Sequence, residues 1–179
     1  YRRQTSVGLS AGFAECGKCD EDCALEQVIG LSAVTGRDGE WTLLAQSPSA
    51  HIGIEDEPML AVLGERYELV SHSHNIAGYG QFVWWRDGTR QIAFEPMLAP
   101  YVLASTFRAE YRPPGRDTVV ELIERTGGIS VESTDQTSDE YVEGSFALAD
   151  AISGVHLTRK LLDSAEFTCC LLYTSDAAD

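Results

Sequence analysis

The dipeptide Asp87-Gly88 constrains this chain more than any other feature, because it separates two runs rich in apolar and aromatic residues. Asp-Gly in that setting predicts a two-residue type I′ turn, in which both central residues take positive φ and the turn twists with its strands. Trp85 then lies opposite Arg90. An antiparallel hairpin is therefore the element around which we expect the chain to be organised.

An unbroken ladder from this turn sorts the hairpin side chains onto two faces, because neighbours along a strand point in opposite directions. We expect the core to be formed by the face that carries Trp85, Val83, Ile92 and Phe94. The second face carries Phe82, Trp84, Ala93 and Gln91. Because Phe82 and Trp84 need cover from a helix or from another protein, they are candidate partner-binding residues.

The other local signals alternate between short helices and short strands. Proline near a helix start, glycine at helix ends and Thr-x-x-Glu spacing predict helices, while short apolar runs bounded by Gly, Pro or Ser predict strands. We expect helices at 20–30, 57–64, 118–127, 141–153 and 158–162, and further strands at 41–46 and 129–132. The fold class is therefore α+β, an antiparallel β meander packed with several short helices.

Charge and composition exclude several kinds of partner. The chain has 28 acidic and 13 basic residues, a net charge of −15, and an acidic surface repels phosphate backbones, so no nucleic-acid partner is expected. No apolar run approaches the ~20 residues that a membrane helix needs, and the start lacks the apolar stretch of a signal peptide. Five unevenly spaced cysteines make no disulfide framework, which favours the cytoplasm.

Both ends of the chain read as foreign to the fold. Residues 170–179, CLLYTSDAAD, match the translation of a transposon-type sequencing adapter, and residues 1–4 are close to its reverse complement. We expect these ends to lie outside the natural protein. Residues 41–169 are then expected to form one α+β domain, preceded by a poorly defined segment at 1–40.

Cys16, Cys19 and Cys23 form the sharpest chemical candidate in the N-terminal segment. Thiolates at such spacing hold zinc or an iron–sulfur cluster, but either usually needs four ligands. No second Cys-x-x-Cys and no nearby histidine supplies the fourth. The alternative is a set of reduced thiols without a metal.

His72 and His74 are separated by one residue on a predicted strand, so both imidazoles point to one face. His51 and either Glu68 or Glu95 could complete a two-histidine, one-carboxylate metal site. The alternative is a pair of histidines on a sheet surface. No nucleophile elbow, phosphate loop or dinucleotide fingerprint occurs, so no organic cofactor is expected.

Several short motifs resemble a known family. They are Trp41-Thr42-Leu43-Leu44, Val70-Ser71-His72-Ser73-His74-Asn75, Phe82 to Gly88, Phe94-Glu95-Pro96, and Ala147-Leu148-Ala149 followed by Gly154 to Thr158. Over residues 41–168 the chain resembles the bacterial domain of unknown function 6461. The resemblance implies a small intracellular protein and assigns no activity, cofactor or catalytic residue. The cysteine-bearing N-terminal segment departs from the family's pattern.

These features favour a binding or regulatory protein over an enzyme. The first hypothesis is an acidic cytoplasmic module that binds a protein partner through Phe82 and Trp84 or through the acidic residues of 135–143; an immunity-type role fits this description. The alternative is a metal-dependent enzyme with His72, His74 and a carboxylate at its centre.

Overall fold

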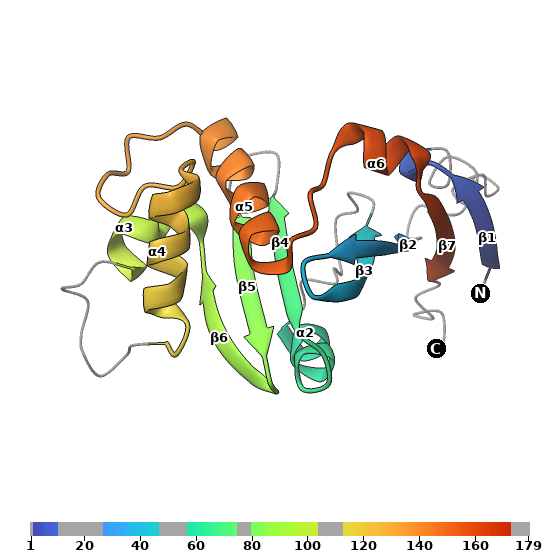
Figure 1. Ribbon diagram of the computed structural model, residues 1–179, viewed down its shortest axis with the longest axis horizontal. Coiled ribbons are helices and arrows are strands. Elements are labelled where there is room, and N and C mark those ends of the chain that lie inside the picture. The colour runs from blue at the N-terminus through green and yellow to red at the C-terminus, as the bar shows by residue number, and fades with distance from the viewer. Residues whose placement is uncertain (1, 11–26, 47–56, 75–79, 104–112, 173–179) are drawn as a thin grey trace, which may run out of the picture. The chain divides into compact units, whose positions relative to one another are not determined.

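The computed structural model describes residues 2–10, 27–46, 57–74, 80–103 and 113–172 (Figure 1). The chain divides into two compact units, one made of residues 1–53 and 155–179 and the other of residues 54–154. Both units combine an antiparallel sheet with helical structure, which confirms the α+β class. Residues on both sides of 41–169 form strands of the first unit, and the expected single domain over that range stays a prediction.

The first unit is built on a four-stranded antiparallel sheet with the strand order β1-β7-β2-β3. Its strands are β1 (Arg2–Val7), β2 (Gln27–Gly36), β3 (Gly39–Gln46) and β7 (Glu166–Leu172), and helix α6 (Arg159–Ser164) precedes β7. Phe167 and Cys169 alternate onto one face of β7, where they are fully buried with Leu43 and Leu162 packed against them. β3 and α6 confirm the strand predicted at 41–46 and the helix predicted at 158–162.

One expectation about the first unit is wrong. A helix was predicted at 20–30, but residues 27–36 form β2, which is hydrogen-bonded to β3 on one side and to β7 on the other. Long-range pairing on both sides therefore overrides the local helical spacing. Residues 170–172 continue β7, which pairs with both β1 and β2, and the assignment of residues 170–179 to adapter sequence stays a prediction.

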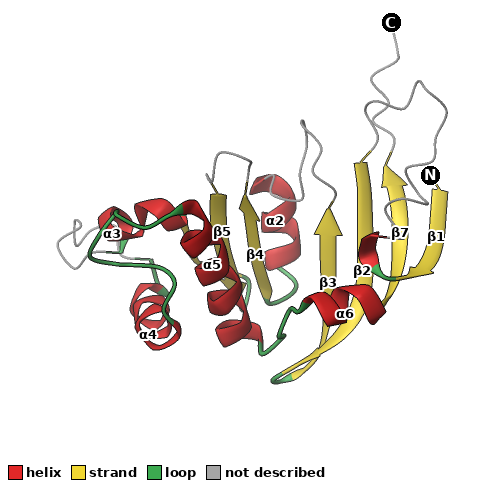
Figure 2. Cartoon of the chain, turned by 90° about the horizontal axis from the view of Figure 1, so that it is seen from above, coloured by secondary structure: helices red, strands yellow, loops and turns green. Residues whose placement is uncertain are grey.

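The second unit carries a three-stranded antiparallel sheet with the order β4-β5-β6. Its elements are α2 (Glu57–Gly64), β4 (Leu69–His74), β5 (Gly80–Arg86), β6 (Thr89–Phe94), the 3₁₀ turn η1 (Pro96–Leu98), α3 (Ala99–Val102), α4 (Arg116–Thr126) and α5 (Ser138–Ser153). α4 and α5 contact each other, and α5 contacts β4, as Figure 2 shows from above. The predicted helices at 57–64 and 141–153 are confirmed, and Gly154 ends α5 in the left-handed conformation.

The turn between β5 and β6 is the one that the sequence predicts. Asp87 and Gly88 both have positive φ, 52° and 71°, as a type I′ turn requires. The pairing of Trp85 with Arg90 is also confirmed. The hairpin therefore starts in the expected register.

One residue further from the turn the register changes at a β-bulge. Trp84 pairs with Ile92 instead of Gln91, Val83 pairs with Ala93, and Phe82 pairs with Phe94. Gln91 is the extra residue, and its side-chain Nε2 donates to the carbonyls of Arg86 and Thr89 at 3.3 and 3.2 Å. The predicted register is therefore wrong beyond the first pairs.

The bulge also corrects the predicted faces of the hairpin. Inserting one residue reverses the direction of every later side chain on that strand. The large apolar side chains consequently share one face, and all four are buried: Phe82, Trp84, Ile92 and Phe94. Helices α4 and α5 cover this face with Val119, Ile123 and Leu148, whereas Val83 and Trp85 face the opposite side with Leu60 of α2.

Glycine at two positions permits the close approach of α5 to the end of α4. Gly128 has a φ of 88°, and a Cβ there would lie 2.6 Å from the Cα of Gly144. A Cβ on Gly144 would in turn lie 2.6 Å from the carbonyl carbon of Gly128. Side chains larger than hydrogen at these positions would push the two segments apart.

The local signals around α4 and α5 were partly misread. A capping box was predicted at Thr118, but α4 begins at Arg116 with Gly115 as its N-cap and no side-chain cap. The capping box lies instead at Thr137 and Glu140, where it starts α5. The strand expected at 129–132 is a turn, because Ser130 Oγ accepts hydrogen bonds from the following backbone amides.

The corrected faces predict unequal effects on stability at two neighbouring positions of β5. Phe82→Ala is expected to lower the free energy of unfolding by about 3–5 kcal/mol, because it leaves a cavity in a closed core. Gln81→Ala, on an exposed side chain one residue earlier, is the control and should change it by less than about 0.5 kcal/mol. Urea titrations followed by tryptophan fluorescence measure both, and equal effects would contradict the bulged register.

Candidate functional site

The two histidines singled out in the sequence lie side by side on β4. His72 pairs with Phe82 and His74 with Gly80 across β5. Directly paired residues share a face of an antiparallel sheet, so both imidazoles point to the face that α5 covers. The prediction that they share a face is confirmed, and that face is the packed one.

His72 is held between the sheet and α5. Its ring meets the ring of Phe146 edge-on, with the centroids 4.3 Å apart. Burial, and secondly the neighbouring His74, lower the pKa of His72 to about 4. The imidazole is therefore neutral at pH 7, and its Nδ1 is buried without a hydrogen-bond partner.

His74 lies next to His72, with the ring centroids 5.6 Å apart and the planes tilted by 52°. Gly80 gives it room, because a Cβ on Gly80 would lie 2.6 Å from His74 Nδ1. Both ring nitrogens of His74 are buried, and within the described part of the chain neither has a hydrogen-bond partner. Burial lowers the pKa of His74 as well.

The two carboxylates that were expected to complete a metal site, Glu68 and Glu95, do not form a metal cluster with His72 and His74. Glu68 Oε1 accepts a hydrogen bond from Trp84 Nε1 at 3.1 Å, and Glu95 Oε1 is buried without a partner. His51 lies outside the described residues. Within the part of the chain that the structure describes, no three His, Cys, Asp or Glu side chains come together as a metal cluster. The expected two-histidine, one-carboxylate set is therefore not assembled there.

The cysteine candidates Cys16, Cys19 and Cys23 also lie outside the described residues, so their metal-binding role stays a prediction. Cys169, which the sequence did not single out, is buried on β7 in the core of the first unit.

Phe82 and Trp84 are not the partner-binding surface that the sequence predicted. Their side chains are 0% and 5% exposed, and the cover that they need comes from α4 and α5 of the same unit. The prediction failed because it assumed an unbroken ladder, which placed the two aromatic side chains on the outer face.

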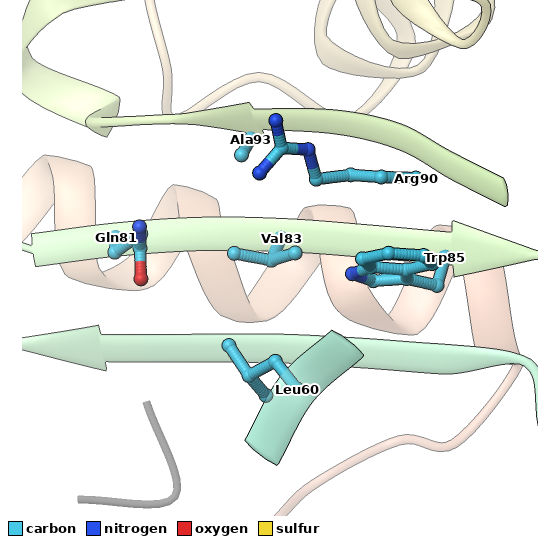
Figure 3. Close-up of a pocket in the computed structure, with 6 residues that line it drawn as sticks. All are labelled: Leu60, Gln81, Val83, Trp85, Arg90 and Ala93. Carbon is cyan, nitrogen blue, oxygen red and sulfur yellow. The ribbon is translucent and has the colours of Figure 1, made fainter. Parts of the chain in front are cut away.

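The opposite face of the sheet carries a small hollow beside α2. It is lined by Leu60, Gln81, Val83, Trp85, Arg90 and Ala93, which Figure 3 shows on α2, β5 and β6. Gly64 of α2 lies against the indole of Trp85, where a Cβ would approach Trp85 Cδ2 to 2.3 Å. The free space is about that of one water molecule. Organic ligands need several hundred cubic ångströms, so this hollow is no substrate pocket.

An exposed acidic segment precedes and begins α5. We define it as residues 132–143, with the exposed side chains Glu132, Asp135, Asp139, Glu140 and Glu143. No Lys or Arg occurs between Arg125 and Arg159, whereas six acidic residues do. The helix predicted from residue 141 begins three residues earlier, at Ser138, so the second half of the segment forms the first turns of α5.

Hydrogen bonds hold the backbone of the acidic segment in one conformation. Gln136 Nε2 donates to the Gly128 carbonyl at 2.9 Å, and Gln136 Oε1 accepts from the amide of Ser130. The Thr137 amide donates to Glu140 Oε2 at 2.6 Å, and the Glu140 amide donates to Thr137 Oγ1. The Thr137 amide, and secondly the Thr137 hydroxyl, donate to the Glu140 carboxylate and lower the pKa of that carboxyl. The other carboxylates of the segment are therefore carried on an ordered support.

Sequence reasoning missed Phe146 as a functional candidate. Phe146 is 41% exposed while one edge of its ring contacts His72. Asp139, Glu143 and Phe146 have the spacing i, i+4, i+7 on α5 and are all exposed, so they lie along one side of the helix. That spacing is readable in the sequence once the start of α5 is placed at Ser138.

Comparison with known proteins gives one family. The model of the family described as "Family of unknown function (DUF6461)" matches residues 5–177, so the chain belongs to this family. The match confirms the resemblance found in the motifs and extends it to the cysteine-bearing N-terminal segment, which had been set apart from the family's pattern. No curated protein and no solved structure matches the chain.

Among the helices that the structure describes, none combines the length and the apolar character needed to cross a membrane.

The depressed pKa of His72 predicts a loss of stability in acid. An unfolded histidine takes up its proton near pH 6.5, while folded His72 does so only at about pH 4. Between these values the unfolded state binds more protons, so the free energy of unfolding should fall as the pH drops from 6.5 to 4, by about 3 kcal/mol in total from this group.

This prediction is measured by urea unfolding at several pH values, in EDTA so that only proton binding is followed. A Trp41→Phe background restricts the fluorescence signal to Trp84 and Trp85 of the second unit. His72→Leu should flatten the dependence on pH between 6.5 and 4, while His156→Leu should leave it unchanged. If the free energy of unfolding of His72→Leu fell as steeply between pH 6.5 and 4 as that of the parent protein, groups other than His72 would cause the acid sensitivity.

Proposed function

We propose that this chain is a binding module, acting in the cytoplasm, that recognises a basic protein through its acidic segment. The observation that carries the proposal is the exposed stripe of Asp139, Glu143 and Phe146 on α5, next to the ordered acids of 132–135. An exposed aromatic side chain beside polar groups is the arrangement of an interface anchor with a polar rim, and the carboxylates here would make that rim negatively charged.

Electrostatics support a positively charged partner. The whole chain carries a net charge of −15, and a surface of one sign accelerates encounter with a partner of the opposite sign and disfavours like-charged ones. The acidic segment concentrates this charge, because no Lys or Arg occurs from residue 126 to residue 158.

Order in the segment supports binding at low entropic cost. The hydrogen bonds of Gln136 to residues 128 and 130 and the capping box of Thr137 and Glu140 hold the backbone before a partner arrives. A surface that is ordered in advance loses less conformational freedom on association. Neutralisation of a basic toxin, as by an immunity-type protein, is one activity that such a surface serves.

The proposal predicts that charge in the acidic segment decides partner binding. The test variant is Glu132→Gln/Asp139→Asn/Glu143→Gln, which spares the capping residue Glu140. The matched control is Glu65→Gln/Glu121→Gln/Glu124→Gln, which removes the same number of exposed carboxylates elsewhere in the second unit. A partner is isolated with the unaltered protein from cells that carry the gene, identified, and titrated in purified form against all three proteins.

The test variant should bind at least about tenfold more weakly than the control, since three charge contacts are removed. Affinity for the unaltered protein should also fall as the salt concentration rises from about 0.05 to about 0.5 M. Equal binding by the test and control variants, or a partner that binds independently of salt, would contradict the proposal.

A further inference from the structure

Three ring nitrogens of the histidine pair are buried and have no hydrogen-bond partner among the described residues: His72 Nδ1, His74 Nδ1 and His74 Nε2. Buried polar side-chain atoms in proteins are nearly always satisfied, and each unsatisfied one costs about 1–3 kcal/mol. Three unsatisfied nitrogens therefore lie close together in two neighbouring rings of β4. A bound species that accepts an electron pair or a hydrogen bond from these nitrogens would satisfy them.

The separation of the two rings suits a shared metal ion. Imidazole nitrogens bind transition metals at about 2.1 Å, which holds the centroids of two rings on one ion about 5–6.5 Å apart, depending on the angle at the metal. The centroids of His72 and His74 are 5.6 Å apart. The pair meets this condition without a change of backbone, because both residues already share one face of β4.

Neighbouring groups select the ligand atoms. The Nδ1 edge of His74 faces Gly80, whose Cα hydrogen leaves no room for an ion on that side. Nε2 is then the nitrogen of His74 that is able to bind. For His72 the unpartnered nitrogen is Nδ1, while Phe146 packs edge-on against the ring and holds its plane.

We propose that His72 Nδ1 and His74 Nε2 bind a divalent transition-metal ion of the zinc, copper or nickel class. Neutral imidazole is a preferred ligand for these ions. In the described residues no carboxylate or thiol joins the two rings as a third ligand, so water or a small anion fills the remaining positions and the affinity is modest. This site is independent of the partner surface proposed on the acidic segment.

Phe146 of α5 packs against His72 with the ring centroids 4.3 Å apart. The position of the pair beneath Phe146 connects the metal to α5, because a bound ion would hold the ring that Phe146 contacts. We expect metal binding to stabilise the packing of α5 on β4.

The test uses the full chain with Cys16→Ser/Cys19→Ser/Cys23→Ser, so that thiols do not contribute to metal binding. Zn²⁺ is titrated in competition with a chromophoric chelator at neutral pH. One equivalent is expected to bind, and His72→Gln and His74→Gln should each weaken binding at least about tenfold. His156→Gln, which changes an exposed histidine of the first unit, is the matched control and should bind as before.

Gly80→Ala tests the geometry without removing a ligand. A Cβ at this position would lie 2.4 Å from the Ser73 carbonyl oxygen and 2.6 Å from His74 Nδ1. The His74 ring and the neighbouring backbone of β4 would therefore both shift, and Zn²⁺ binding should weaken. A second measurement is NMR of the imidazole nitrogens in the chain that carries only the three cysteine substitutions. Zn²⁺ is expected to shift the signals of His72 and His74 and of no other histidine. Failure of Zn²⁺ to bind, binding that survives in both histidine variants, or shifts confined to other histidines would overturn the proposal.

Discussion

The bulge at Gln91 is the feature on which the second unit depends. Without it, the hairpin would divide its large apolar side chains between two faces, and neither face would make a complete core. With it, four aromatic or aliphatic side chains meet on one face, two of them being Phe82 and Trp84. The amide of Gly115 donates to the Gln91 carbonyl at 2.9 Å, so the bulge also anchors the start of the helix that covers this face.

The helices that cover this face also bury the histidine pair of β4. β4 continues the apolar face of β5, and α5 packs on it with Phe146 against His72. Two imidazoles thereby enter a region where their charged forms are disfavoured and their nitrogens lack partners. The same packing explains the acid sensitivity expected of the second unit and the metal site proposed on β4, because both follow from neutral, unpartnered rings.

α5 joins the interior of the second unit to its acidic surface. Tyr141 and Leu148 on its inner side are 1% and 0% exposed, whereas Asp139 and Glu143 on its outer side are exposed. Gly128 and Gly144 allow the helix to lie close to the end of α4, and Gln136 ties the preceding segment to the same place. The position of the acidic surface is therefore set by core packing.

The sequence by itself determined the features that depend on contacts between near neighbours. The type I′ turn at Asp87-Gly88, the shared face of His72 and His74 and the left-handed glycine at 154 follow from local backbone preferences, and the structure has all three. Tertiary structure decided the bulge, the burial of Trp84 and the strand at 27–36. These depend on segments distant in the chain, because the free energy of burying a face exceeds the small local preferences that sequence reasoning follows.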